Sequence, residues 1–137
     1  MWPEGSVVAM GPLQIRVVGA VRSTQDEVWS KRRWLQPGNG VAARLQSAGV
    51  GRGGKSWLSP EGGVYFSALV GHGFPSADAD VLGEAAALAV VRAGRELLKG
   101  EKLFVKWPND VVTWGPKRSL GKVAGVIVRA EIAGDRV

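Results

Sequence analysis

The 137-residue sequence has no cysteine and a single histidine, His72. The absence of cysteine excludes disulfides, thiolate metal sites and thiol catalysis. One histidine argues against a histidine-rich metal site and against a serine–histidine or cysteine–histidine nucleophile. His72 lies between two glycines after a predicted strand, which favours a turn residue over a catalytic one.

The sequence also lacks an apolar run of membrane-spanning length, and its N-terminus lacks the basic start and apolar core of a secretion signal. A soluble cytoplasmic protein without membrane contact is therefore predicted. Its length favours one domain, and its 45% hydrophobic and 22% charged residues are typical of a globular chain.

Formal net charge is +6, which suits a nucleotide, a nucleic acid or an acidic protein partner, although a basic surface without any such partner has the same charge. A nucleic-acid-binding domain ranks low because the sequence shows neither an aromatic-interleaved basic strand nor a recognition helix.

Strand patterns outnumber helix patterns. Capping-box spacing predicts a short helix that begins at Ser23 and Thr24 and ends by Pro37. The Ala- and Leu-rich segment 78–99 predicts the longest helix, with Gly100 as its C-terminal cap. The order is not a regular βαβ alternation, so an α+β fold with a mixed β-sheet backed by helices is predicted. The predicted strands are 13–19, 41–46, 64–70, 102–107, 110–114 and 122–132, the last two paired through 115–121.

The stretch "GVGRGGKS" (49–56) matches both G-x-x-x-x-G-K-[ST] and G-x-G-x-x-G. Both patterns need a helix directly after the glycines to present N–H groups to phosphate. Here "WLSPEGG" (57–63) follows, and its late proline and paired glycines argue against a helix. We therefore reject both patterns and predict a ligand-ordered loop in which Arg52 and Lys55 meet phosphate oxygens. A flexible hairpin loop with incidental basic residues is the alternative.

A second group of residues follows later in the chain. "KWPND" (106–110) ends a predicted strand in a rigid turn that presents an amide and a carboxylate together. "GKVAGV" (121–126) places Lys122 at the start of an apolar strand, where a lysine is costly unless it meets an anion. A lysine that extends to water at a sheet edge is the alternative.

Together, four segments in this order resemble the catalytic domain of biotin protein ligases: "STQ" (23–25), "LQSAGVGRGGKSWLSPEGGVYFS" (45–67), "KWPND" and "GKVAGVIV" (121–128). The combination of "KWPND" with a later "KVAG" is the most specific part. The resemblance implies a class II aminoacyl-tRNA-synthetase-like fold. It also implies that biotin and ATP react to biotinyl-5′-AMP, and that biotin then passes to a lysine in the carrier domain of a biotin-dependent carboxylase.

The resemblance implies a role for each matching residue. Catalysis would fall to Lys122, Arg52 and Asp110. Mg²⁺ would accompany the nucleotide, with Asn109 and Asp110 beside the phosphates and the ion. The implied biotin-binding residues are Ser23, Thr24, Gln46, Gly49, Arg52, Lys122 and Gly125, and the implied nucleotide-binding residues are Arg52, Lys55, Trp57, Trp107, Asn109, Asp110 and Lys122.

The chain departs from the family pattern in places. Val50 and Lys55 stand where the family's loop usually has arginines, and the connection from Asp110 to Lys122 is longer than usual. Residues 1–137 are expected to form one truncated catalytic domain with neither an N-terminal DNA-binding domain nor the family's C-terminal β-domain. Two functional alternatives stay open: a non-catalytic or split member that binds biotin or its adenylate, and a relative that ligates lipoate or octanoate. Exposed strand edges also suggest a homodimer as a hypothesis.

Overall fold

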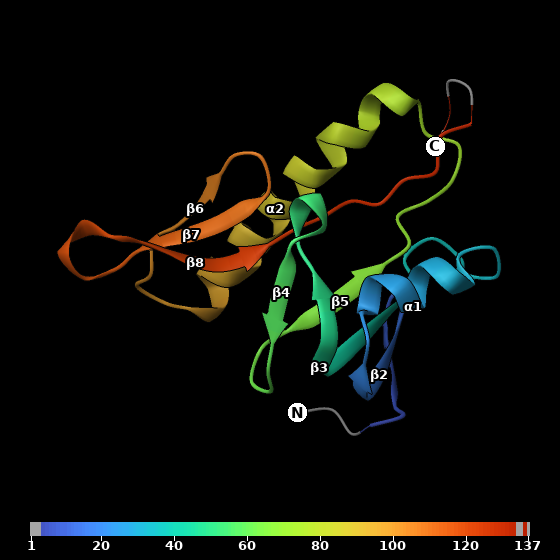
Figure 1. Cartoon of the computed structure of the whole chain (residues 1–137), viewed down its shortest axis with the longest axis horizontal. Helices are drawn as coiled ribbons and strands as arrows, with labels where there is room; N and C mark the ends of the chain where they lie inside the picture. Colours follow the sequence, from blue (N-terminus) through green and yellow to red (C-terminus); the bar gives the residue numbers. More distant parts are fainter. Residues whose placement is uncertain (1–3, 134–135, 137) are drawn as a thin grey trace. The chain divides into compact units, whose positions relative to one another are not determined.

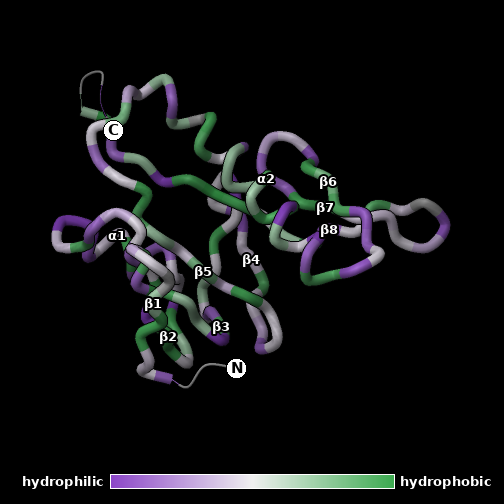
Figure 2. Tube along the Cα trace, turned by 180° about the vertical axis from the view of Figure 1, so that it is seen from behind, coloured by the Kyte–Doolittle hydropathy of each residue, from purple (hydrophilic) through white to green (hydrophobic). Residues whose placement is uncertain are grey.

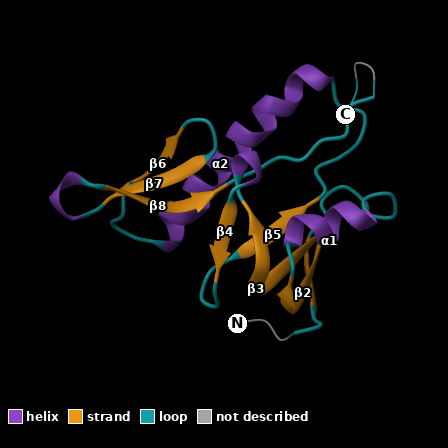
Figure 3. Ribbon diagram, viewed as in Figure 1, coloured by secondary structure: helices purple, strands orange, loops and turns teal. Residues whose placement is uncertain are grey.

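A computed structural model of the chain describes residues 4–133 and 136. The chain forms two compact units, the first extending to His72 and the second beginning at Gly73 (Figure 1). The predicted α+β class is confirmed. The strands, however, form two sheets rather than one: a five-stranded sheet in the first unit and a three-stranded sheet in the second (Figure 3).

The five-stranded sheet is mixed because β2 and β3 run parallel, with Ile15 opposite Gly40 and Val21 opposite Gln46. Parallel strands need a crossover connection, which α1 supplies. All other pairs in this sheet are antiparallel. The unit comprises β1 (Val7–Met10), β2 (Leu13–Val21), α1 (Thr24–Lys31), β3 (Gly40–Val50), β4 (Ser56–Ser59) and β5 (Tyr65–Ala68).

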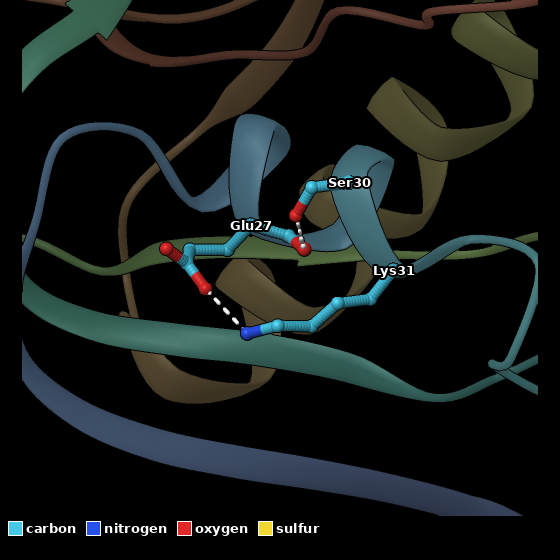
Figure 4. A network of polar contacts seen from close by, with 3 residues as sticks. All are labelled: Glu27, Ser30 and Lys31. Atoms are coloured by element: carbon cyan, nitrogen blue, oxygen red, sulfur yellow. Dashed lines mark hydrogen bonds and ion pairs between the residues drawn. The ribbon is translucent and has the colours of Figure 1, made fainter.

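Helix α1 begins where the capping signal predicts. The Ser23 hydroxyl oxygen accepts a hydrogen bond from the backbone N–H of Asp26 at 3.4 Å. Further along the helix, Lys31 pairs with Glu27 at 2.7 Å, and the Ser30 hydroxyl donates to the carbonyl of Glu27 at 3.0 Å (Figure 4). Both charged side chains are about half exposed, so this pair contributes only about 0.3–0.5 kcal/mol.

The second unit packs one long helix on the three-stranded antiparallel sheet β6-β7-β8. Its core is Ala87 and Val91 from the helix with Leu103 and Val111 from the strands, each at most 2% exposed. Figure 2 shows the hydrophobic residues of β7 in green. No helix within the described residues combines the length and apolar content that a membrane crossing needs. The elements are α2 (Ala79–Leu97), β6 (Leu103–Lys106), β7 (Asp110–Trp114) and β8 (Leu120–Gly125).

Several predicted boundaries are wrong, among them the following three. Helix α2 ends at Leu97 with Leu98 as its cap, and Gly100 follows two residues later with φ +96°. Strand β3 continues to Val50, four residues beyond its predicted end. Strand β8 ends at Gly125 rather than at residue 132, because its partner β7 begins opposite that glycine and offers no further residues to pair with. Strands β1 and β4 were not predicted at all.

Candidate functional site

In the first unit, the start of α1 meets the end of β3 through a set of hydrogen bonds. The Gln46 side-chain oxygen accepts from the backbone N–H of Thr24 at 2.7 Å and from its hydroxyl at 3.1 Å. Ser23 and Thr24 are 3% and 4% exposed. The parallel register places Gln46 opposite Val21, the last residue of β2, so the crossover from β2 through α1 brings three of the seven predicted biotin-binding residues together.

Two serines that the sequence analysis missed complete this set. The Ser67 hydroxyl lies 2.9 Å from the Thr24 hydroxyl. The Gln46 amide nitrogen donates to the Ser59 hydroxyl at 3.0 Å, and that hydroxyl donates to the carbonyl of Trp57 at 3.1 Å. Both serines lie on strands that pair with β3, a placement that only the sheet topology reveals.

The glycine-rich loop is shorter than predicted and is followed by a strand. Residues 52–54 form one turn of 3-10 helix, in which Gly53 and Gly54 have φ +69° and +75°. The N–H of Gly51 donates to the carbonyl of Lys55 at 2.6 Å and closes this turn. Strand β4 then begins at Ser56, so the prediction that no helix follows the glycines is confirmed.

The two cations of the loop are exposed, and neither the Arg52 side chain nor the Lys55 side chain has a partner among the described residues. Gly49, by contrast, lies inside β3 and is buried. A Cβ at Gly49 would lie 2.5 Å from the Trp57 carbonyl oxygen and 2.6 Å from the Ser59 hydroxyl. Only glycine fits there, so Gly49 belongs to the polar set rather than to the loop.

In the second unit, "KWPND" forms the turn between β6 and β7, with a cis bond between Trp107 and Pro108. Strand β8 pairs with β7 so that Lys122 lies opposite Val112, and Gly125 opposite Asp110. The Nζ atom of Lys122 lies 2.6 Å from Oδ1 of Asp110. In the structure the anion beside this lysine is a carboxylate of the same unit, and its contact with a ligand anion stays a prediction.

The environment of this ion pair is partly open to water, with 40% of the Lys122 side chain and 23% of the Asp110 side chain exposed. Its contribution to stability is therefore small, about 1 kcal/mol or less. Oδ1 of Asp110 is buried and accepts no hydrogen bond of good geometry within the described residues. Lys122 thus offsets the charge of this oxygen through proximity.

The other residues of "KWPND" are held by neighbouring elements. The Asn109 side chain donates to the carbonyl of Val126 at 2.9 Å, and its backbone carbonyl accepts from the Val126 N–H at 2.8 Å. The indole N–H of Trp107 donates to Glu84 of α2 at 2.7 Å. Trp107 is nevertheless 74% exposed, which leaves much of its ring available for stacking.

Comparisons with known proteins match both units. The model of the biotin/lipoate A/B protein ligase family matches residues 17–136. A biotin–protein ligase of Schizosaccharomyces pombe is 34% identical over 132 residues, covering 85% of this chain. Two solved structures are also similar: the Leishmania major biotin protein ligase in complex with biotinyl-5-AMP (TM-score 0.70, 27% identity, 93% of this chain) and the Aquifex aeolicus biotin protein ligase in complex with biotin and ATP (TM-score 0.65, 31% identity, 89% of this chain).

These relatives are longer than the chain. It spans 21% of the Schizosaccharomyces pombe protein, 55% of the Leishmania major chain and 48% of the Aquifex aeolicus chain. The family match nevertheless covers most of this sequence and contains all the segments described above. The chain belongs to the biotin/lipoate A/B protein ligase family.

Proposed function

We propose that this chain activates biotin with ATP as part of a biotin protein ligase. One observation carries the proposal: paired strands hold Lys122 2.6 Å from Asp110, next to the "KWPND" turn. Family membership and the two similar enzymes, whose structures hold biotin, ATP or biotinyl-5-AMP, support it. The residue roles below are part of the proposal, as is the assignment of residues 1–137 to one catalytic domain.

In the first unit, three of the residues proposed for biotin carry no charge. Ser23, Thr24 and Gln46 supply hydroxyl and amide groups, which suit the uncharged polar ring of biotin. The hydroxyl of Ser23 accepts the capping bond from Asp26 and still has its own hydrogen to donate. Hydrogen bonds from buried, neutral groups discriminate strongly against a ligand that lacks the matching atoms, because the protein groups then lose their partners.

In the second unit, the proposed chemistry is the approach of two anions. An oxygen of the biotin carboxylate attacks the α-phosphorus of ATP, the bond from that phosphorus to the bridging oxygen breaks, and pyrophosphate leaves. Lys122 would turn from Asp110 toward these oxygens and offset the negative charge that builds up between them. Trp107 and Gly125 would border the nucleotide and biotin respectively.

The loop of residues 51–55 has a different proposed role. Biotinyl-5′-AMP is a mixed anhydride that water destroys, so an enzyme has to shield it until transfer. Arg52 and Lys55 have no partner among the described residues and can meet the phosphate of the adenylate, while Trp57 lies at the start of the following strand. The positive φ of Gly53 and Gly54 lets the loop backbone turn sharply.

A magnesium ion fits the second unit only as a companion of the nucleotide. The described residues contain no cluster of three or more His, Cys, Asp or Glu side chains that could hold a metal ion. Mg²⁺ is commonly bound through one or two carboxylates together with substrate phosphates. Asp110 and the side-chain oxygen of Asn109 would hold it, and the ion would offset phosphate charge when bound.

Transfer completes the proposed reaction. The amine of a carrier-domain lysine attacks the acyl carbon of biotinyl-5′-AMP, and AMP leaves with the pair of electrons from the broken bond. This step needs no nucleophilic residue on the enzyme, which fits a sequence without cysteine and with a single histidine. The proposed partner is the carrier domain of a biotin-dependent carboxylase.

Calorimetry and product analysis test the proposal. Biotin and lipoate are titrated separately into the protein, each with and without ATP, and nucleotide products are separated by chromatography. Biotin binding with biotin-dependent pyrophosphate release is expected. Lipoate-dependent release instead would assign the chain to lipoate ligation. Biotin binding without any turnover would make it a non-catalytic binder.

A further inference from the structure

The hydrogen bonds around Gln46 form one continuous chain. It runs from the Ser67 hydroxyl to the Thr24 hydroxyl, then to the two ends of the Gln46 amide, to the Ser59 hydroxyl and finally to the Trp57 carbonyl. Every step is between 2.9 and 3.1 Å. The backbone N–H of Thr24 joins the chain at the amide oxygen, at 2.7 Å.

Two backbone groups fix the direction of this chain. The Trp57 carbonyl can only accept, so the Ser59 hydroxyl must donate to it and must accept from Gln46. The Thr24 backbone N–H can only donate, so it requires an oxygen of Gln46 on its side. Both requirements agree on one orientation of the Gln46 amide, and a flipped amide would break both contacts.

The polar chain also explains the glycine at position 49. A bulge in β3 between Gln46 and Gly49 brings this segment against β4. A Cβ at Gly49 would lie 2.6 Å from the Ser59 hydroxyl and 3.1 Å from the Gln46 amide nitrogen, so any side chain there would displace their contact. Ser59 itself is 5% exposed, and water therefore cannot easily replace its hydroxyl.

We propose that Ser59 is a positioning residue that sets the orientation of the Gln46 amide for ligand recognition. It acts through Gln46 and touches no reacting atom. With one N–H held by Ser59, the second N–H of Gln46 has no partner within residues 4–133 and 136 and is free to donate to a ligand oxygen. The orientation thus makes Gln46 a donor toward its ligand, and Thr24 keeps its acceptor end occupied.

This inference rests on the proposed function for the identity of the ligand, which is biotin. A double-mutant cycle tests it, because residues that act through each other are not additive. Ser59→Ala is expected to weaken biotin binding about tenfold, the size of one lost hydrogen bond, with little change in the turnover rate at saturating biotin. In a Gln46→Met background, which keeps the side-chain length and lacks the amide, Ser59→Ala is expected to change binding less than about twofold.

Two controls accompany the cycle. Ser47→Ala removes an exposed serine hydroxyl from the same strand as Gln46 and is expected to leave biotin binding unchanged. Ser59→Cys keeps a weak donor and acceptor at nearly the same volume and is expected to restore part of the loss. An equal loss from Ser59→Ala in both backgrounds would overturn the proposal, as would no loss at all.

A measurement without ligand separates this inference from the proposed function. Exchange of the Gln46 side-chain amide protons with water, followed by NMR, is expected to be about tenfold slower than that of the exposed Gln36. In Ser59→Ala or Ser59→Cys the difference should shrink. If wild-type protein binds no biotin, the proposed function fails, and the exchange rates still decide whether Ser59 holds the amide. Unprotected Gln46 protons in the wild type would overturn the inference.

Discussion

Lys122 and Asp110, twelve residues apart, form an ion pair with 2.6 Å between Nζ and Oδ1. The pair lies across adjacent antiparallel strands, and no hydrogen bond of good geometry within the described residues satisfies Oδ1 of Asp110. The ion pair therefore positions the lysine before any ligand binds. We expect the ammonium to exchange Asp110 for a carboxylate or a phosphate of a ligand without a change in the fold.

Replacing this lysine tests its proposed role. Lys122→Ala is expected to reduce biotin-dependent pyrophosphate release at least about 100-fold, because the charge that offsets the approaching anions is lost. The fold should persist although Asp110 loses its counter-charge, because the pair is partly open to water and contributes about 1 kcal/mol or less. Circular dichroism checks the fold. Lys117→Gly is the matched control: it removes a cation from the same hairpin at a position with φ +57°, which suits glycine, and should leave activity unchanged.

Arg52 is expected to govern retention of the intermediate more than its synthesis. Its guanidinium lies on the exposed turn of residues 52–54, where it can pair with the adenylate phosphate. Arg52→Gly should therefore still form biotinyl-5′-AMP but release it, so that bystander lysines become biotinylated. Mass spectrometry of an added non-substrate protein measures this leakage. A variant that retains the intermediate as well as the wild type would contradict the assignment.

Ser56 separates adenylation from a nucleotide triphosphatase mechanism. In a P-loop enzyme this serine would hold the metal ion, and its loss would stop cleavage between the β- and γ-phosphates. Here Ser56 is exposed and begins a strand, so Ser56→Ala should be nearly silent. Nucleotide products should be AMP and pyrophosphate, and only with biotin present. Biotin-independent ADP, or an inactive Ser56→Ala, would show that the rejected motif was right.

The core of the second unit should be sensitive to truncation. Leu103 is 1% exposed and packs against α2, so Leu103→Ala is expected to lower the free energy of unfolding by about 2–5 kcal/mol. Leu97 is 81% exposed at the end of the same helix, so Leu97→Ala should change the free energy of unfolding by less than about 0.5 kcal/mol. Urea unfolding measures both. Equal effects would contradict the packing described for this unit.

The sequence predicted the elements that local chemistry decides. Ser23 caps α1 as its spacing indicates, and the proline and glycines after Ser56 exclude a helix. Lys122 was expected to meet an anion because it stands at the start of an apolar strand. These features depend on residues that are close in sequence, so short motifs are enough to predict them.

Features that depend on distant pairing could not be predicted in the same way. Ser59 and Ser67 reach Gln46 only because β4 and β5 both pair with β3, and no spacing in the sequence encodes that choice. The end of β8 depends on where β7 begins, and the need for glycine at position 49 depends on atoms of Trp57 and Ser59 across the sheet. The register between strands supplied each of these relationships.

The hydrogen-bond chain from Ser67 to the Trp57 carbonyl contains only hydroxyl, amide and peptide groups, none of which carries charge at neutral pH. Ionic strength should therefore act unequally on the two proposed ligands. Added salt screens Arg52, Lys55 and Lys122 and should weaken nucleotide binding. It has no charge to screen along the chain that holds Gln46. Titrations at rising potassium chloride concentration should therefore lower the affinity for ATP more than the affinity for biotin, whose ring is uncharged.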